Sequence, residues 1–375
     1  MTNTYYDKNI KFINANEVEI PKNVKPINVL SLFSGVGGMD LGFVGGFKFL
    51  DNIYSKNPFK IIFANDIFKQ AADVYEYNFE HNVERRSITD LDLSFENVDI
   101  VLGGFPCQTF SYSGKRNGLS DPRGQLYKQM IRVINSCKPK MFIAENVDGI
   151  RNSKKDISGT NVDQSALDTI LEDFEENGYD VQYHVLNAAD YGVPQIRKRV
   201  IIIGIHKDLG DINSQYYPSP THFKDVDENK WLTAKDGIED LWNLIDKTSI
   251  PNHTYKDFSK AKFYPGKKMQ GNNRILSSKP APTIRAEHHG NIEGHYNYIG
   301  DDENDVLGWR RLSVRECARL QSFPDSFNFI SSASSSYKMI GNAVPPVMAW
   351  NIARAVFYTL DKLNCIEKNK EQTLV

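Results

Sequence analysis

The sequence predicts an α/β protein with a parallel sheet covered by helices on both faces, followed by an irregular segment. Apolar runs of strand length alternate with segments of helical spacing through roughly the first 205 residues. Strands that are apolar throughout are typical of a sheet buried on both faces by helical crossovers. After residue 205 the alternation ends, and Pro, Asn, Lys and aromatic residues prevail for about a hundred residues.

Six strands are expected in the first part of the chain, because each run is short, mostly apolar and bounded by polar or glycine-rich stretches. They cover residues 27–33, 60–65, 98–104, 140–146, 181–187 and 199–205. In such a sheet, ligands bind beyond the carboxyl ends of the strands. The residues that follow each strand are therefore the first candidates for a site.

Helices are expected between and after these strands. Segments with helical spacing cover 68–79, 124–137 and 164–177. A further short helix is predicted in 312–323, where Ser313 and Glu316 form a capping box. The last helix is predicted in 344–363, and it is apolar enough to pack on the sheet.

The composition indicates a globular protein of a reducing compartment. Its 375 residues suffice for two domains, since single cores stop growing near ~250–300 residues. The four cysteines lack C-x-x-C spacing, so neither disulfides nor a metal cluster is expected. The chain shows no signal pattern and no apolar run of the ~18 residues that span a bilayer. A soluble, cytoplasmic protein without membrane contact is predicted.

Positive charge is concentrated in residues 251–290, although the formal net charge of the chain is -2. This segment contains eight basic residues and only two acidic ones, and histidines and tyrosines are interleaved with them in the sequence. Such a run is more often a solvated face than a binding site. The interleaved aromatic residues nevertheless suit contacts to phosphates and bases.

A glycine-rich turn, residues 33–38, follows the first strand and opens a helix. Its glycines can let the backbone approach a ligand above the sheet edge. The dinucleotide pattern G-x-G-x-x-G would require glycine at position 40, which is Asp40, so an adenosine-type ligand without a pyrophosphate is favoured over a nicotinamide cofactor. Asp66, at the end of the second strand, is placed to accept hydrogen bonds from ribose hydroxyls or to cap the next helix.

Cys107 follows Pro106 at the point where the third strand gives way to a polar loop. A thiol at a strand end faces a cleft rather than a core. The common structural use of cysteine, a buried and unreactive thiol, is assigned instead to Cys137, Cys317 and Cys365.

Six sequence blocks occur together in one order: "LFSGVGG", "GGFPCQTFSYSG", "ENVDGI", "QIRKRVIIIG", "RECARLQSFP" and "IGNAVPP". With them the chain resembles the cytosine-5 DNA methyltransferases of bacterial restriction-modification systems. The resemblance implies a Rossmann-like S-adenosylmethionine-dependent fold, with a mixed, mostly parallel sheet and a smaller irregular target-recognition domain. It places the catalytic domain at 1–205, completed by 336–375, and recognition domain and hinge at 206–335.

The resemblance implies a sequence-specific enzyme that flips a cytosine out of the duplex and methylates its carbon 5. Cys107 would add to carbon 6, because carbon 5 alone is too weak a nucleophile. Glu145 would hold ring N3, and Arg197 and Arg199 would reach the cytosine carbonyl and neighbouring charges. Alternation along a strand puts these two arginines on one face and Lys198 on the other.

The resemblance also implies which residues bind S-adenosylmethionine. They are Phe33, Ser34, Gly35, Gly37, Gly38, Asp66, Ile67, Ser87, Ile88, Pro106, Leu126, Asn342 and Ala343. Two positions depart from the family pattern: Asp66 stands where Glu is usual, and Ser87 stands where an Asp contacts the adenine amino group.

For double-stranded DNA, the resemblance implies that Ser113 enters the duplex and Arg123 meets phosphate or the pocket. In the basic segment, Arg274, Arg285 and His288 are candidates for base edges. The expected partners are DNA and a cognate restriction endonuclease encoded alongside, with the enzyme itself a monomer.

Two other functions fit the same fold. A tRNA cytosine-5 methyltransferase would typically carry Cys-Phe-Thr in its recognition region, and no cysteine here precedes Phe-Thr. A catalytically silent DNA-binding regulator would not need the intact "PCQ" and "ENV".

Overall fold

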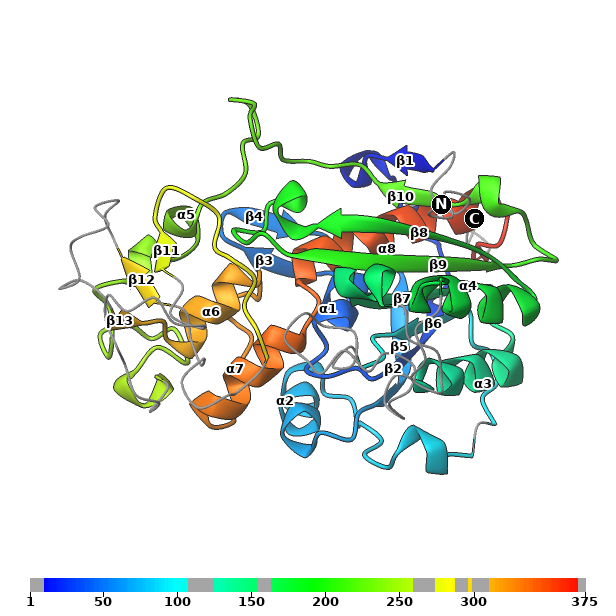
Figure 1. The fold of residues 1–375 in the computed structure, drawn as a ribbon, viewed down its shortest axis with the longest axis horizontal. Helices are drawn as coiled ribbons and strands as arrows, with labels where there is room; N and C mark the ends of the chain where they lie inside the picture. Colours follow the sequence, from blue (N-terminus) through cyan, green and yellow to red (C-terminus); the bar gives the residue numbers. More distant parts are fainter. Residues whose placement is uncertain are drawn as a thin grey trace, which may run out of the picture.

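The computed structural model describes residues 10–92, 94–106, 125–153, 163–258, 274–286, 296–298 and 310–369. A central sheet with helices on both faces occupies one side of the molecule, and short elements of the later chain form the other side (Figure 1). Among the described residues, no helix is both long and apolar enough to cross a bilayer.

The central sheet has six strands in the order β5-β2-β6-β7-β9-β8. Their bounds are β2 (Ile27–Leu32), β5 (Phe59–Asn65), β6 (Ile100–Gly103), β7 (Met141–Val147), β8 (Tyr179–Asn187) and β9 (Lys198–His206). All six predicted strands are thus confirmed, with ends shifted by a few residues. The mixed, mostly parallel sheet of the expected fold is also confirmed.

The apolar pattern alone predicted a wholly parallel sheet, which is wrong for one strand, β9. β5, β2, β6 and β7 pair in parallel, whereas β9 runs antiparallel to both β7 and β8. The connection from β8 to β9, residues 188–197, contains only a 3-10 turn, and parallel strands need a longer crossover. Both strands are nevertheless largely buried, which explains their apolar pattern.

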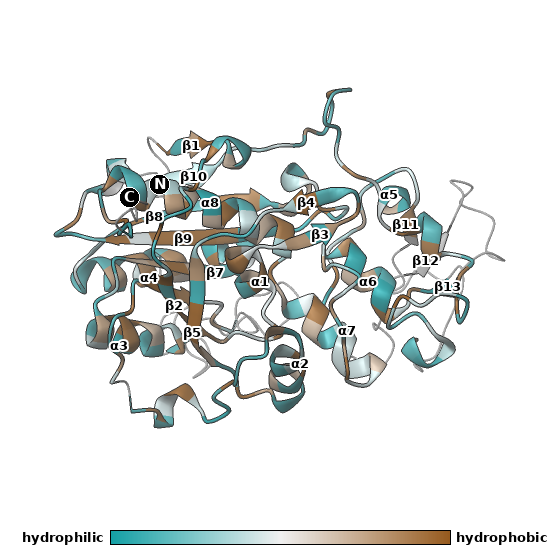
Figure 2. Cartoon of the chain, turned by 180° about the vertical axis from the view of Figure 1, so that it is seen from behind, coloured by the Kyte–Doolittle hydropathy of each residue, from teal (hydrophilic) through white to brown (hydrophobic). Residues whose placement is uncertain are grey.

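Helices cover the two faces of this sheet. α1 (Gly38–Val44), α2 (Lys69–Phe79) and α8 (Pro346–Lys362) contribute to the core on one face. α3 (Tyr127–Cys137) and α4 (Ala166–Glu176) contribute to the core on the other. Strands of the central sheet are largely brown, for hydrophobic residues, whereas the helices that cover it mix brown with teal (Figure 2). The helices predicted in these segments are confirmed.

Glycine allows α1 and α8 to pack in close contact. A Cβ added at Gly42 would overlap the Cβ of Ala349 and crowd the backbone of Pro346 and Trp350. The two helices therefore approach almost backbone to backbone. As a result, α8 packs in the same hydrophobic core as β2.

A third core lies under the later part of the chain. It contains α5 (Ala234–Ile238), α6 (Val314–Leu320) and α7 (Ala333–Asn342), and a three-stranded sheet of β11 (Arg274–Leu276), β12 (Tyr296–Tyr298) and β13 (Arg310–Arg311) accompanies it. The predicted capping box of α6 is confirmed, because Ser313 and Glu316 exchange both hydrogen bonds.

Smaller elements complete the fold. β10 (Tyr216–Pro218) pairs in parallel with β1 (Lys11–Ile13), and β3 (Phe47–Phe49) pairs with β4 (Asn52–Tyr54). The 3-10 turns are η1 (Ala15–Glu17), η2 (Ile88–Asp90), η5 (Asp148–Asn152), η6 (Ala188–Tyr191), η7 (Ile212–Ser214), η8 (Glu239–Leu241) and η9 (Tyr255–Asp257). Because β10 also contacts α8, the chain stays with the sheet beyond residue 205.

Candidate active site

The carboxyl ends of β2, β6 and β7 meet at one edge of the sheet. Gly104, just after β6, is the meeting point, and its N–H donates to Leu32 O at 3.4 Å. A Cβ on Gly104 would lie 3.7 Å from Glu145 Oε2 and 3.9 Å from Phe33 O. The candidate base-binding carboxylate of Glu145 thus lies beside the glycine-rich turn and beside Gly104, which precedes Pro106 by two residues.

The glycine-rich turn is held against the end of β5 by Asp66. One carboxylate oxygen of Asp66 accepts from Gly35 N–H at 2.8 Å, and the other accepts from Phe68 N–H at 2.7 Å. Burial raises the pKa of Asp66. The N-cap of α2 is Phe68, so Asp66 supports the start of this helix from two residues away.

Space for a ligand opens above this turn. Gly35 has a φ of +56°, and a Cβ placed there would meet no atom within 4 Å. Nearby in the chain, Ile67 is 70% exposed. An open backbone, a carboxylate and an exposed apolar side chain suit an adenosine group, whose hydroxyls and flat ring require these contacts.

The other two glycines of the turn are explained by packing. Gly37 has a φ of +82°, and a Cβ there would overlap the ring of Phe79. A Cβ on Gly38 would overlap Val344 O and lie 3.2 Å from Ala343 Cβ. The turn therefore brings the first and last sequence blocks together, as expected of one shared site.

Asp40 belongs to the core rather than to a ligand site. It is buried and accepts hydrogen bonds from Ser31 Oγ at 2.8 Å and from Tyr75 Oη at 2.6 Å. Burial raises its pKa to about 6. The residue that breaks the dinucleotide pattern is thus a structural carboxyl group.

The remaining cofactor candidates differ in burial and in their contacts. Ser34 N–H donates to Asn65 O, and Asn65 Nδ2 donates to Arg86 O at 2.9 Å, next to Ser87. Ser87 caps η2 and Ile88 is buried. Pro106 and Leu126 are half-buried, while Asn342 is exposed.

Glu145 and Arg199 form an ion pair at the end of the β7–β9 ladder. Arg199 Nε lies 2.7 Å from Glu145 Oε1, and both side chains are about nine-tenths buried. Arg199 Nη1 also donates to Lys198 O. The pair fixes the orientation of the carboxyl group, with Glu145 Oε2 on the side of Gly104.

Arg197 is placed differently from the expectation that it reaches the cytosine carbonyl. It is completely buried, with Nη1 donating to Ile284 O and Nη2 to Gly341 O and Ala343 O. Lys198 is exposed, as the alternation predicts. The guanidinium of Arg197 is therefore engaged with backbone carbonyls rather than directed at the site.

Asn146 is a residue that the sequence analysis missed. It is buried, its Nδ2 donates to Phe105 O at 3.2 Å, and its Oδ1 accepts from Val147 N–H. Phe105 directly precedes Pro106 and Cys107. The position of Asn146 in "ENV", directly after Glu145, was the available signal that it supports the segment before Cys107.

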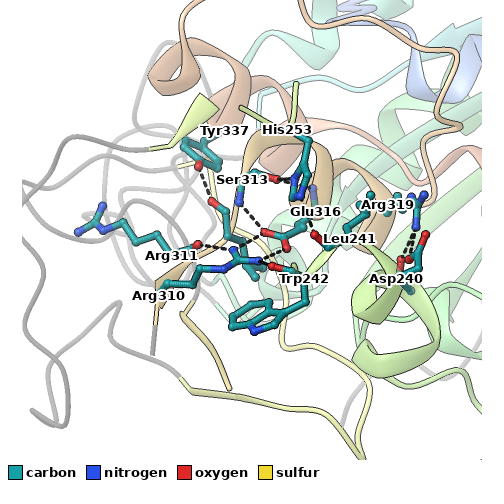
Figure 3. Close-up of polar contacts among 12 residues, drawn as sticks. Asp240, Leu241, Trp242, His253, Arg310, Arg311, Ser313, Glu316, Arg319 and Tyr337 are labelled. Atoms are coloured by element: carbon teal, nitrogen blue, oxygen red, sulfur yellow. Dashed lines mark hydrogen bonds and ion pairs between the residues drawn. The ribbon is translucent and has the colours of Figure 1, made fainter. Parts of the chain in front are cut away.

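A second polar cluster ties α6 to β13 and to the region around η8 (Figure 3). Arg310 donates to both carboxylate oxygens of Glu316, at 2.8 and 2.6 Å, and its guanidinium carbon lies 3.5 Å from the centre of the Trp242 ring. His253 bridges Ser313 Oγ and a backbone carbonyl of η8. The sequence analysis found only the capping box within this network.

Several predicted residues fall outside the described part of the chain, namely Cys107, Ser113, Arg123 and His288. For Arg274 only the backbone, in β11, is described. Arg285 is described and exposed, directly after buried Ile284.

The other three cysteines are poor nucleophiles. Burial raises the pKa of Cys137 to about 11, and it raises the pKa values of Cys317 and Cys365 as well. Cys317 is fully buried, whereas Cys137 and Cys365 are half-buried. Within the described residues, no group of three His, Cys, Asp or Glu side chains could hold a metal ion.

Comparison with known proteins decides the family. A family profile described as C-5 cytosine-specific DNA methylase matches residues 27–358. The chain belongs to the C-5 cytosine-specific DNA methylase family. The expected membership is thus confirmed.

Curated relatives of the methylase match over nearly their whole length. It is 35% identical to the type II methyltransferase M.FnuDI of Fusobacterium nucleatum, over 92% of this chain and 98% of that protein. It is 34% identical to M.BsuRI of Bacillus subtilis, over 98% and 90%.

Solved structures share the fold of the methylase at lower identity. A DNA modification methyltransferase encoded within an E. coli prophage matches with a TM-score of 0.59 and 24% identity, over 89% of this chain and 99% of that chain. The methyltransferase EhMeth of Entamoeba histolytica matches with a TM-score of 0.61 and 18% identity, over 90% and 99%.

Proposed function

We propose that this DNA cytosine-5 methylase is sequence-specific and uses Cys107 and Glu145 to activate a flipped cytosine. The observation that carries the proposal is the buried Glu145, held by Arg199 beside Gly104 at the strand edge. Only two residues separate Gly104 from Cys107 in the sequence. A nucleophile and a group for ring N3 would then come from neighbouring strands.

The proposed chemistry divides between these two side chains. The Cys107 thiolate forms a bond to carbon 6, and the electron pair of the 5,6 double bond becomes available at carbon 5. The Glu145 carboxyl group hydrogen-bonds at N3, which limits the negative charge that the ring must carry. After methylation, loss of the carbon-5 proton and departure of the thiolate restore the aromatic ring. The base must first leave the stack, at a cost of a few kcal/mol.

S-Adenosylmethionine is the proposed cofactor, and it would supply the methyl group as a sulfonium. The open space over Gly35, the Asp66 carboxylate and the exposed Ile67 fit its adenosine part. Ala343, which follows Asn342, approaches the same turn from the other end of the chain. The shorter Asp66, in place of Glu, is compatible with this role because it already reaches the turn through Gly35 N–H.

DNA is proposed to bind across this edge, with the region 206–335 reading the sequence. The exposed Arg285 and the net positive charge of residues 251–290 support this assignment. Because the curated relatives are type II methyltransferases, we also propose a protective role in the cytoplasm beside a cognate endonuclease.

One experiment tests both the reaction and the nucleophile. The protein is incubated with S-adenosylmethionine tritiated in its methyl group and mixed-sequence duplex DNA, and labelled 5-methylcytosine is expected. DNA containing 5-fluorocytosine should then trap the parent irreversibly but not Cys107→Ser, because fluorine cannot leave as a proton does. Absence of labelled cytosine, or a trapped Cys107→Ser variant, would contradict the proposal.

A further inference from the structure

Two buried side chains, Gln195 and Arg197, clamp a single residue of the recognition region. Gln195 Oε1 accepts from Ile284 N–H at 3.0 Å, and Arg197 Nη1 donates to Ile284 O at 3.1 Å. Both side chains are completely buried. The residue that follows Ile284 is Arg285, an exposed candidate for contact with DNA.

Backbone hydrogen bonds beside Gln195 and Arg197 join the same two segments of the chain. Ala281 N–H donates to Pro194 O at 2.9 Å, and Ile196 N–H donates to Ala281 O at 2.8 Å. Thr283 Oγ1 donates to Ile196 O at 2.7 Å. Residues 281–284 therefore run alongside 194–197, which lead directly into β9 and Arg199.

The same two side chains also hold the end of α7. Arg197 Nη2 donates to Gly341 O at 2.8 Å and to Ala343 O at 2.9 Å. Gln195 Nε2 donates to Gln321 Oε1, and Gln321 Nε2 donates to Ala343 O, both at 2.6 Å. Asn342 and Ala343 are the carboxyl-terminal residues of the proposed cofactor site.

Glycine brings these two segments into direct contact. A Cβ added at Gly341 would overlap the backbone of Arg285 and Ala286. A shift of the recognition segment would therefore move the last turn of α7, and a shift of that turn would move the segment. The contact leaves no gap that could absorb such a movement.

We infer that Arg197, with Gln195, is a positioning residue that couples DNA recognition through residues 281–286 to cofactor binding through residues 341–343. This inference rests on the proposed function. Coupling is reciprocal, so bound cofactor should sharpen the preference for the recognised sequence, and the recognised sequence should tighten cofactor binding by the same factor.

The test measures that factor with a non-reactive ligand. S-Adenosylhomocysteine binding is titrated without DNA, with a duplex carrying the sequence found by bisulfite mapping of host DNA, and with a scrambled duplex. For the parent, the mapped duplex should tighten binding at least about fivefold more than the scrambled one. In Arg197→Met this difference should fall to nearly onefold, and Arg197→Lys should recover part of it.

Arg354→Met is the matched control for lost stability. Arg354 is another buried arginine; it bonds to Ala15 O and Asn57, away from the recognition segment. The Arg354→Met variant should keep the coupling factor of the parent despite a lower Tm. If Arg197→Met does not fold, Thr283→Val carries the test, because it removes only the bond to Ile196 O, which Thr283→Ser keeps.

Two results would overturn the inference. One is a parental coupling factor in both Arg197→Met and Thr283→Val. The other is an Arg197→Met enzyme that keeps both affinities and their coupling but loses kcat, which would place Arg197 at the base. Failure of the parent itself to bind S-adenosylhomocysteine or to methylate DNA would instead reject the proposed function.

Discussion

Arg199 reaches across the β7–β9 ladder to hold Glu145, with Nε 2.7 Å from Oε1. Its backbone partner in the ladder is Val147, so the ion pair is a diagonal contact on one face of two antiparallel strands. Breaking one partner of a buried pair leaves the other charge uncompensated.

Arg199→Ala should therefore lower kcat by about 10²- to 10³-fold, as removal of a fixed donor from a charged site does. Arg199→Lys should recover only part of this, because an ammonium group cannot reproduce the planar donor geometry. Single-turnover methylation assays measure the methylation rate of each of these two variants. Lys198→Gln, on the exposed side of the same strand, is the control and should stay within about twofold of the parent. A parental rate for Arg199→Ala would exclude this role.

Asn146→Asp should slow covalent trapping by 5-fluorocytosine DNA at least about tenfold, because the loss of one aimed hydrogen bond costs about 1.4 kcal/mol or more. The change keeps the acceptor for Val147 N–H but removes the donor to Phe105 O, which precedes Pro106 and Cys107. Binding of S-adenosylhomocysteine should be unchanged. Equal trapping rates would show that the Phe105 carbonyl needs no such restraint.

Asp66→Asn should weaken S-adenosylhomocysteine binding about tenfold or more in calorimetry. Asp66 accepts from both Gly35 N–H and Phe68 N–H, and an amide offers an acceptor oxygen to only one of them. Asp73→Asn, on the outer side of α2 in an ion pair with Arg85, provides the control. Parental affinity in Asp66→Asn would remove Asp66 from the proposed site.

Asp40→Asn should change the pH dependence of stability between about pH 4 and pH 6. Because burial raises the pKa of Asp40 to about 6, its neutral form stabilises the fold fully below about pH 4, and that contribution is lost as the pH rises through 6. The amide stays neutral and can bond to Ser31 and Tyr75. In urea unfolding, the free energy of unfolding of the variant relative to that of the parent should therefore increase by up to about 3 kcal/mol between pH 4 and pH 7. A constant difference across that range would contradict the assignment.

Gly42→Ala should lower the free energy of unfolding by at least about 2 kcal/mol, because the new methyl group overlaps Ala349 Cβ between α1 and α8. A fall in Tm of several degrees would report this loss. The double variant Gly42→Ala/Ala349→Gly should recover part of it by removing the opposing methyl group. Unchanged stability in the single variant would show that the two helices can separate freely.

The strands and most helices could be predicted because burial on both faces and amphipathic spacing are local properties of the chain. The reversed direction of β9 could not, since it depends on the length of the connection from β8 rather than on the apolar residues of either strand. α7 was also missed. Its first turn lies in a serine-rich stretch, and Ser332 acts there as an N-cap that binds Ser335 N–H.

The residues of the site also divide into those that could be predicted from the sequence and those that could not. Asp66 could be placed from its position at the end of a strand, and Glu145 and Arg199 from the family resemblance of "ENV" and "QIRKR". The burial of Arg197 could not, because its acceptors at Ile284, Gly341 and Ala343 lie far away in sequence and are backbone atoms. A sequence motif names the side chain but carries no signal for a carbonyl acceptor.

The bridge between Val24 and Lys368 brings a segment early in the chain side by side with the segment that follows α8. A linker could therefore join these two segments, and new termini could be opened in the exposed stretch 224–230. Such a circular permutant would begin with the recognition segment and end with the central sheet. The order in which the two parts are synthesised would be reversed, while every contact around Glu145 would be retained.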